Sequence, residues 1–223
     1  MKQKRRLGRP PKSDSQNRRR EILSAALDLF SQQGFEATSI RQIASQVGIS
    51  DPALYSHFKS KQEILEDLFE LFGPKAVFAA SENLDVLSAA KSPWTFAENA
   101  LNKLAERWFD QEENKFFRLM LLENLTGNIP KHLTLDAIQK PMRQKLNELA
   151  AWLIKNGIAV KTDPEWMSTQ FTAPIAAIRT EVAIDPERHT LPEIAQRLRD
   201  HLRQFSGVFL PGLKKLNESN DRQ

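Results

Sequence analysis

Residues 39–61, SIRQIASQVGISDPALYSHFKSK, set the architecture of this chain. Ser39 is followed three residues later by Gln42. This is a capping box, in which each side chain satisfies a free backbone N–H of the other residue, so we expect a helix to begin here. Gly48 is placed to end that helix, because glycine readily adopts the left-handed conformation found after a last helical turn. Ser50 can then cap a second short helix, and the stretch predicts two short helices joined by a tight turn.

Helical patterns continue on both sides of this turn. Upstream, apolar residues recur at the spacing of one helix face and stop before Gly34; they are Ile22, Ala25, Ala26, Leu29 and Phe30. Downstream, Pro52 suits a first helical turn, and Ser60 with Glu63 forms another capping box that opens a fourth helix. A longer helix followed by two short helices across a glycine-containing turn is a helix-turn-helix unit. We therefore expect a DNA-binding domain over residues 15–62.

The remainder of the chain is also helical in pattern, without the alternating runs of surface strands. Pro141 is well placed to start a helix, and Pro174 lies inside an apolar helical pattern, where it indicates a kink or a break. We therefore predict an all-α protein, with a three-helix N-terminal helix-turn-helix domain and a larger C-terminal helical domain over residues 63–223.

Composition narrows the class of protein. Of the 223 residues 40% are apolar and 27% are charged, which is typical of a folded globular chain of one or two domains. The absence of cysteine excludes disulfide bonds and thiolate metal sites. No apolar run approaches the roughly 18 residues that a membrane helix needs. We expect a cytoplasmic protein with no membrane partner.

The residues that could carry catalysis are scattered. The four histidines lack the spacing of metal ligands on one helix; they are His57, His132, His189 and His201. There is no phosphate-cradling glycine loop and no nucleophile elbow. We expect no metal, no cofactor and no enzymatic activity. A helical protein-interaction module is the other noncatalytic reading, but it would not account for the ordered helix caps and the basic N-terminus.

Positive charge is concentrated at the N-terminus. The first twenty residues carry nine lysines and arginines against one acid, Asp14, in a chain whose net charge is only +4. Such a block favours a polyanionic partner, although a solubilising tail has the same composition. Residues 1–14 lack core-forming side chains, so we expect a disordered basic arm. Within it, Gly8-Arg9-Pro10 is close to an AT-hook core, in which arginine enters a narrow minor groove. The alternative is an arm that makes only nonspecific phosphate contacts.

Residues 22–68 contain several short motifs at characteristic distances from one another. They are AALDLF at 25–30, GFEATS at 34–39, IA at 43–44, VGIS at 47–50 and LYSHFKSK at 54–61. Together they resemble the DNA-binding domain of TetR-family regulators. The resemblance implies a DNA-binding head joined by a fourth helix to a larger helical domain. It also implies a homodimeric repressor that binds a palindromic operator in double-stranded DNA and is released by a small, apolar molecule.

The resemblance assigns DNA contacts to individual positions. Those that match base or phosphate contacts in relatives are Arg41, Ser50, Pro52, Ala53, Tyr55, Ser56, His57 and Lys61, to which the arm adds Arg9. Pro52 and Ala53 match residues that touch base edges or thymine methyl groups. Tyr55, His57 and Lys61 match residues that commonly hold phosphates.

Two groups of apolar residues in the larger domain invite a functional interpretation. The steps of four and three between Leu191, Ala195, Leu198, Leu202, Phe205 and Phe209 form a narrow helix-packing seam, which suits either an ordinary core helix or a dimer interface shared with residues 163–182. The resemblance favours the dimer, through Phe171, Ile175, Ile178, Leu191, Leu198, Leu202 and Phe205. Aromatic residues and one methionine in the middle of the chain could be core or could line an apolar effector pocket; they are Trp94, Trp108, Phe109, Phe116, Phe117, Met120 and Trp152.

Overall fold

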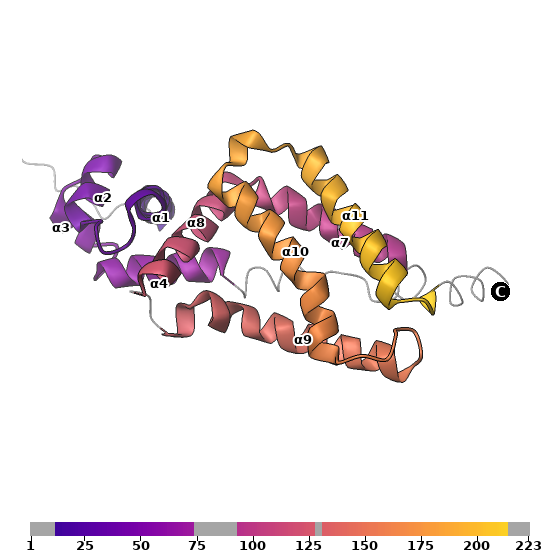
Figure 1. Ribbon diagram of the computed structural model, residues 1–223. Coiled ribbons are helices and arrows are strands. Elements are labelled where there is room, and N and C mark those ends of the chain that lie inside the picture. Colours follow the sequence, from indigo (N-terminus) through magenta and orange to yellow (C-terminus); the bar gives the residue numbers. More distant parts are fainter. Residues whose placement is uncertain (1–11, 74–92, 128–130, 214–223) are drawn as a thin grey trace, which may run out of the picture.

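The computed structural model describes residues 12–73, 93–127 and 131–213, and every regular element there is helical, which confirms the all-α prediction. The elements are α1 (Lys12–Gln33), α2 (Ile40–Val47), α3 (Asp51–Tyr55), α4 (Lys61–Phe72), α7 (Pro93–Trp108), α8 (Gln111–Thr126), α9 (Leu135–Lys155), α10 (Pro164–Ile184) and α11 (Leu191–Phe209), with short 3-10 turns at Lys131–Leu133 and Pro186–Arg188. Helices α1–α4 form the head and α7–α11 form the body (Figure 1). Arg9 lies outside the described residues.

The caps of the helix-turn-helix unit form as their sequence predicts. The Gln42 backbone N–H donates to Ser39 Oγ at 3.2 Å, and the Ser39 N–H donates to Gln42 Oε1 at 2.7 Å. Gly48 ends α2 with φ 73°, in the left-handed region that disfavours other residues. Ser50 Oγ accepts from the backbone N–H of Ala53 at 3.4 Å at the start of α3. Each of these contacts spans three or fewer residues, so local sequence determines it.

Two helix boundaries differ from the expectations drawn from the sequence, and of the kink or break expected at Pro174 the break does not occur. Helix α1 begins at Lys12, inside the range expected to be a disordered arm. Helix α9 begins at Leu135, where Thr134 Oγ1 accepts from the Ala137 N–H at 3.2 Å, so Pro141 lies within the helix instead of starting it. Helix α10 runs through Pro174 without a break. Proline removes one helical hydrogen bond, and in both helices the turns on either side remain helical.

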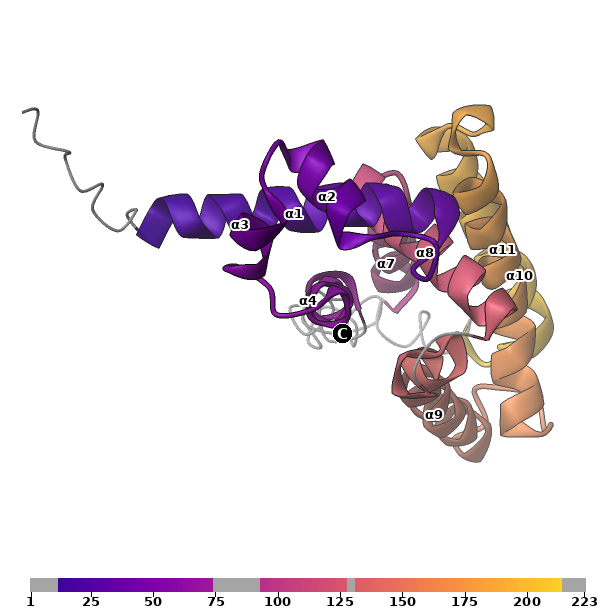
Figure 2. The ribbon, with the colours of Figure 1, turned by 90° about the vertical axis from the view of Figure 1, so that its left-hand side faces the viewer.

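The head and the body share one hydrophobic core. Phe116, Leu119 and Met120 of α8 are buried in the same cluster as the apolar residues of α1, α2, α3 and α4. The Phe116 ring meets the Phe69 ring of α4 edge-on, with 5.1 Å between centroids. Figure 2 shows α8 against the C-terminal half of α1. The head is therefore completed by α4 and α8, and its core does not end at the 62/63 boundary expected from the sequence.

The body is built around the α10–α11 hairpin. The two helices run antiparallel: Trp166 at the start of α10 contacts Phe209 at the end of α11, and Glu181 near the end of α10 pairs with Arg197 near the start of α11. Helix α7 packs along the hairpin (Figure 1). Among the described residues no helix is both long enough and apolar enough to cross a membrane.

Candidate DNA-binding surface and effector region

Helix α3 presents one face to solvent and buries the other. Leu54 and Phe58 are buried in the head core and anchor the helix. On the opposite side Pro52 and Ser56 are exposed, and 52% of Tyr55 is exposed. A short, firmly anchored helix with a free outer face is the arrangement that enters a major groove. Most of the DNA contacts expected from the sequence therefore lie on an accessible surface.

The polar groups around α3 differ in their freedom to bind phosphate. Arg41 is exposed on α2 and borders a shallow hollow of about 440 Å³. The Ser56 hydroxyl donates its proton to the Ala53 carbonyl at 2.7 Å, so that proton is engaged in closing α3. Ser50 Oγ only accepts in its cap, which leaves its hydroxyl proton available to a phosphate.

Lys61 makes internal contacts that its sequence position does not reveal. Its ammonium group donates to the backbone carbonyls of Phe35, Thr38 and Glu36, at 2.6, 2.9 and 3.4 Å. The same nitrogen lies 4.2 Å from the centroid of the Phe35 ring. An ammonium has three N–H donors, and here three carbonyls of the α1–α2 connection receive them. Lys61 is thus placed to hold this connection to α4, and it is not extended towards solvent as the phosphate assignment requires.

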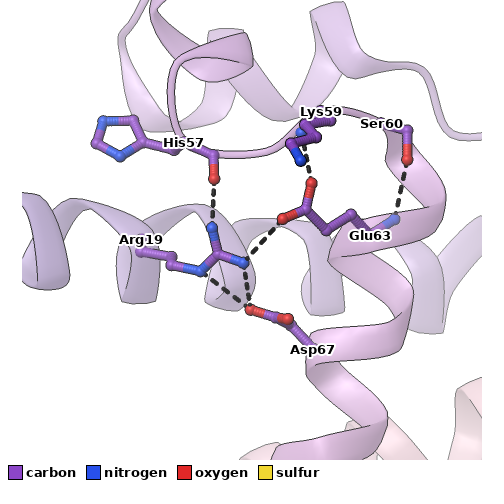
Figure 3. Close-up of polar contacts among 6 residues, drawn as sticks. All are labelled: Arg19, His57, Lys59, Ser60, Glu63 and Asp67. Carbon is purple, nitrogen blue, oxygen red and sulfur yellow. Dashed lines mark hydrogen bonds and ion pairs between the residues drawn. The ribbon is translucent and has the colours of Figure 1, made fainter.

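Arg19 of α1 binds both α4 and the chain that follows α3 (Figure 3). Its Nε and Nη2 atoms donate to Asp67 Oδ2 at 3.0 and 2.7 Å, and Nη2 also reaches Glu63 Oε1 at 3.3 Å. Nη1 donates to the carbonyl oxygen of His57, and the guanidinium carbon lies 3.8 Å from the centroid of the Phe58 ring. One side chain of α1 therefore fastens α4 and the residue that follows the end of α3.

This cluster affects two neighbouring groups. The pKa of Glu63 is lowered, chiefly because its carboxylate accepts the Lys59 backbone N–H at 2.6 Å, with a further contribution from Arg19. Ser60 Oγ caps α4 by accepting the Glu63 N–H at 3.1 Å, so only half of the expected capping box forms. The His57 imidazole points away from Arg19 in Figure 3, which leaves it clear of the cluster.

Polar contacts also join α8 to the head. The buried Glu123 carboxylate accepts the Phe35 backbone N–H at 2.7 Å. Lys115 Nζ forms an ion pair with Asp28 Oδ1 of α1 at 2.5 Å. The other oxygen of Asp28 accepts from Gln46 Nε2 of α2 at 3.4 Å, which is a long hydrogen bond. A displacement of α8 would therefore be felt by both α1 and α2.

The residues expected to line one effector pocket are divided among different surroundings. Phe116 and Met120 face the head core, whereas Trp94, Trp108 and Phe109 belong to the cluster between α7, α10 and α11. Trp152 is 55% exposed on α9. These side chains therefore do not all lie together in the described part of the chain, and an effector pocket lined by some of them stays a prediction.

A buried arginine lies beside two of those aromatic residues. Arg179 of α10 is only 7% exposed. Its Nη1 donates to Asn114 Oδ1 at 2.9 Å and its Nη2 donates to the Glu113 carbonyl at 3.2 Å. The guanidinium carbon lies 4.3 Å from the Phe117 ring centroid and 5.8 Å from that of Trp108. Burial lowers the pKa of Arg179 to about 10, partly opposed by the negative charge of Glu113.

The seam expected at a dimer interface lies largely inside one chain. Leu198 is fully buried, and together with Ile178 and Leu202 it packs in the same cluster as α7. Phe205 is buried with Phe171 near α9. Ile175 and Leu191 pack at the edge of the α7 cluster. The buried members stabilise the folded subunit, and the partly buried Phe171, Ile175 and Leu191 stay predictions for a contact between subunits.

The outer face of the α10–α11 hairpin carries different residues. Its exposed small and apolar positions are Ala173, Pro174, Ala176, Ala177, Ile184, Gly207 and Val208. At the connecting end of the hairpin, a hollow of about 480 Å³ is lined mainly by charged side chains; the lining residues are Glu181, Ile184, Asp185, Arg188, His189, Glu193 and Arg197.

Comparison with known proteins identifies the family. Residues 22–68 match the family described as bacterial regulatory proteins, tetR family. Over 175 residues the chain is 31% identical to the HTH-type transcriptional regulator RutR of Escherichia coli O157:H7, a match that covers 71% of this chain and 75% of RutR. The chain belongs to the TetR family. Over 65 residues it is 42% identical to the HTH-type transcriptional regulator AcrR of Shigella flexneri, and this match covers 29% of the chain and only 30% of AcrR.

Solved structures agree on the fold of this TetR-family chain. NalD, the secondary repressor of the MexAB-OprM multidrug efflux pump in Pseudomonas aeruginosa, aligns with a TM-score of 0.58 and 20% identity over 89% of this chain and 98% of NalD. The protein is therefore a DNA-binding transcriptional regulator with an N-terminal helix-turn-helix domain and a larger helical domain. TetR-family regulators are not enzymes, which confirms the prediction drawn from the missing catalytic motifs.

Proposed function

We propose that this TetR-family protein is a homodimeric repressor that binds a palindromic operator and releases it when a small molecule binds the body. The observation that carries the proposal is the outward face of α3, which is exposed at Pro52, Tyr55 and Ser56 and fixed from behind by Leu54. A helix held in this way can lie in a major groove without any rearrangement of the head.

The proposed DNA contacts are of two kinds, contacts to base edges and contacts to backbone phosphates. Pro52 and Ala53 lie in the first turn of α3, where side chains meet base edges and thymine methyl groups. Tyr55, Arg41 and the Ser50 hydroxyl offer donors to phosphates on either side. His57 can act with them, because its ring is clear of the Arg19 cluster. Arg9 would extend the contact along the duplex, into the minor groove or along its phosphates.

Dimerisation fits the outer face of α10–α11. Small side chains such as Ala173 and Ala177 allow close approach of a second helix pair, and Val208, 64% exposed, supplies an apolar contact. Two heads placed about 34–36 Å apart meet successive turns of one duplex face, which makes the operator palindromic. Repression is supported by NalD, which is named as a repressor and shares the fold.

Selection of bound fragments from a random double-stranded DNA pool tests the DNA-reading part. We expect an enriched palindrome whose half-sites are about 10 base pairs apart between centres. Tyr55→Phe should weaken binding to every sequence, whereas Ala53→Ser should change the preferred base. Failure to enrich any sequence at low salt would contradict the proposal.

Sedimentation equilibrium tests the dimer. Val208→Asp places a charge on the exposed face of α11 and should give monomers that remain folded by circular dichroism. Gln144→Asp, at an exposed position of α9 away from this face, is the control for added charge. A Val208→Asp protein that remains dimeric would place the interface elsewhere.

A further inference from the structure

We infer that Arg179 is the recognition group of the effector site, and that the effector is an organic anion, a carboxylate carried on an aromatic or apolar body. This rests on the proposed function, because it names the class of molecule that releases the DNA. The charge around Arg179, the aromatic rings that cover it and its bonds to α8 each support the inference.

The charge around Arg179 is unbalanced. Within the part of the chain that the structure describes, Arg179 forms no ion pair, although buried cations are ordinarily paired with an anion. The acidic group that acts on the pKa of Arg179 is the Glu113 carboxylate, which accepts hydrogen bonds from both Nε and Nη2 of Arg107. Two cations thus share one carboxylate, and the cluster carries a net positive charge in a place largely closed to water. A second carboxylate would neutralise it.

The geometry of the guanidinium suits that carboxylate. A guanidinium has five N–H donors in a planar fork that matches two carboxylate oxygens. Asn114 Oδ1 and the Glu113 carbonyl receive one N–H each, so donors remain for a ligand. Phe117 and Trp108 flank the group, and Phe117 is only half-buried, so rotation of its ring uncovers the fork. The same two rings would then contact the aromatic or apolar part of the molecule.

The bonds of Arg179 also connect this place to the head. Asn114 is followed directly by Lys115, whose ammonium holds Asp28 of α1, and Asp28 in turn receives the long bond from Gln46 of α2. A carboxylate bound to the remaining N–H groups would draw the guanidinium away from the Glu113 carbonyl and Asn114 Oδ1, which frees the first turn of α8. The resulting shift of Lys115 would alter the orientation of the helix-turn-helix unit relative to the body.

The experiment compares acids with their neutral amides on the full-length protein. The probes are phenylacetate, 1-naphthoate and octanoate, each paired with its amide, and the readouts are the melting temperature and the anisotropy of a labelled operator. The variants are Arg179→Met, which removes the charge, and Arg179→Lys, which keeps the charge but not the fork. Arg199→Met is the matched control, since Arg199 Nη1 also donates to an asparagine oxygen at 2.9 Å, that of Asn102, on another side of the body.

We expect at least one acid to raise the melting temperature of the wild type while its amide does not. Arg179→Met should lower the affinity for that acid by about tenfold or more, the usual loss for a charged hydrogen bond. Arg179→Lys should fall between the two proteins, and Arg199→Met should respond like the wild type. Acids that stabilise none of the proteins, amides that work as well as acids, or an Arg179→Met protein with an unchanged response would each overturn the inference.

The two hypotheses fail differently. If an acid binds through Arg179 but the operator stays bound, the effector site stands and release of DNA by that ligand fails. If a neutral compound releases the operator equally from wild type and Arg179→Met, the proposed regulator stands and the anionic effector is wrong.

Discussion

The contacts of Arg19 with α4 and with the chain after α3 allow a quantitative test of what fixes α3 in the head. Arg19→Ala removes the bonds to Asp67 and Glu63, the bond to the His57 carbonyl and the contact with the Phe58 ring. Charged hydrogen bonds contribute roughly 1.5–3 kcal/mol when buried, but about a third of the Arg19 and Asp67 side chains is exposed, and water screens such pairs. We therefore expect the free energy of unfolding to fall by about 2 kcal/mol.

Arg18→Ala is the matched control. Arg18 is the preceding residue of α1, and its ion pair with Glu21 lies within one helix, with both side chains about half exposed. Such pairs contribute about 0.2–0.5 kcal/mol, so the control should lose a fraction of what Arg19→Ala loses. Urea denaturation followed by circular dichroism measures both proteins. Equal losses would refute the assignment of Arg19 as the main fastening between α1 and α4.

DNA binding provides a second readout for Arg19. Its bond to the His57 carbonyl fixes the chain directly after α3, so Arg19→Ala should weaken operator binding at temperatures where the variant is still folded. Arg19→Lys keeps the charge but lacks the fork that spans Asp67 and the carbonyl, and should restore only part of the affinity. If Arg19→Lys matched the wild type, charge alone would explain the effect and the fork geometry would be irrelevant.

Three further predictions follow from individual contacts. Lys61→Ala should reduce the free energy of unfolding by about 1–3 kcal/mol while the salt slope of operator binding is unchanged. Lys59→Ala, two residues earlier in the loop before α4, should leave the free energy of unfolding nearly unaltered. Leu198→Ala should lower the free energy of unfolding by about 2–5 kcal/mol, as measured by denaturation. Val208→Ala, at an exposed site, should lower it by about 0.5 kcal/mol or less in a monomeric background. The pKa of Glu63 is lowered in the folded protein, so the ionised carboxylate stabilises the fold at pH values above the ordinary glutamate pKa. This stabilisation is lost as the pH falls through the lowered pKa. The melting temperatures of wild type and Glu63→Gln should therefore converge at acidic pH.

The parts of the fold that the sequence predicted depend on near neighbours. The caps at Ser39, Gly48 and Ser50 are made by atoms within a few residues of each other, so their spacing in the sequence is sufficient to find them. Pro141 shows the limit of this reasoning. Proline is only favoured at a helix start and does not require one, and the cap at Thr134 fixed an earlier beginning.

Side chains that reach across the fold could not be found in this way. Arg19 lies in a run of arginines that looks like part of the basic arm, and its partners are 38 to 48 residues away. Lys61 bonds to carbonyls 23 to 26 residues earlier, and backbone carbonyls leave no signal in a sequence. Arg179 and Asn114 are 65 residues apart. The family motif identified the position of Lys61 but not the contact made there, and no motif marked Arg19 or Arg179.

The apolar seam of α11 shows a general limit of sequence reasoning. A narrow apolar stripe on a helix gains the same free energy from burial against its own chain as from burial against another copy. The apolar stripe of α11 therefore predicts that this face of the helix is buried against another helix. Only the three-dimensional arrangement shows that α7 buries it at Leu198. The face proposed for a second subunit carries small residues such as Ala177, whose weak hydrophobic periodicity does not mark them in the sequence.

The position of α8 supports the proposed coupling between ligand binding at Arg179 and the orientation of the head. One side of the helix completes the head core through Phe116 and binds the Phe35 N–H through Glu123, while its first turn accepts both bonds from Arg179. Well-packed interiors do not deform gradually, so a change at the first turn of α8 is transmitted along the whole helix. In the proposed dimer the head would then keep its internal structure while its orientation changes, and that orientation would set the distance between the two α3 helices.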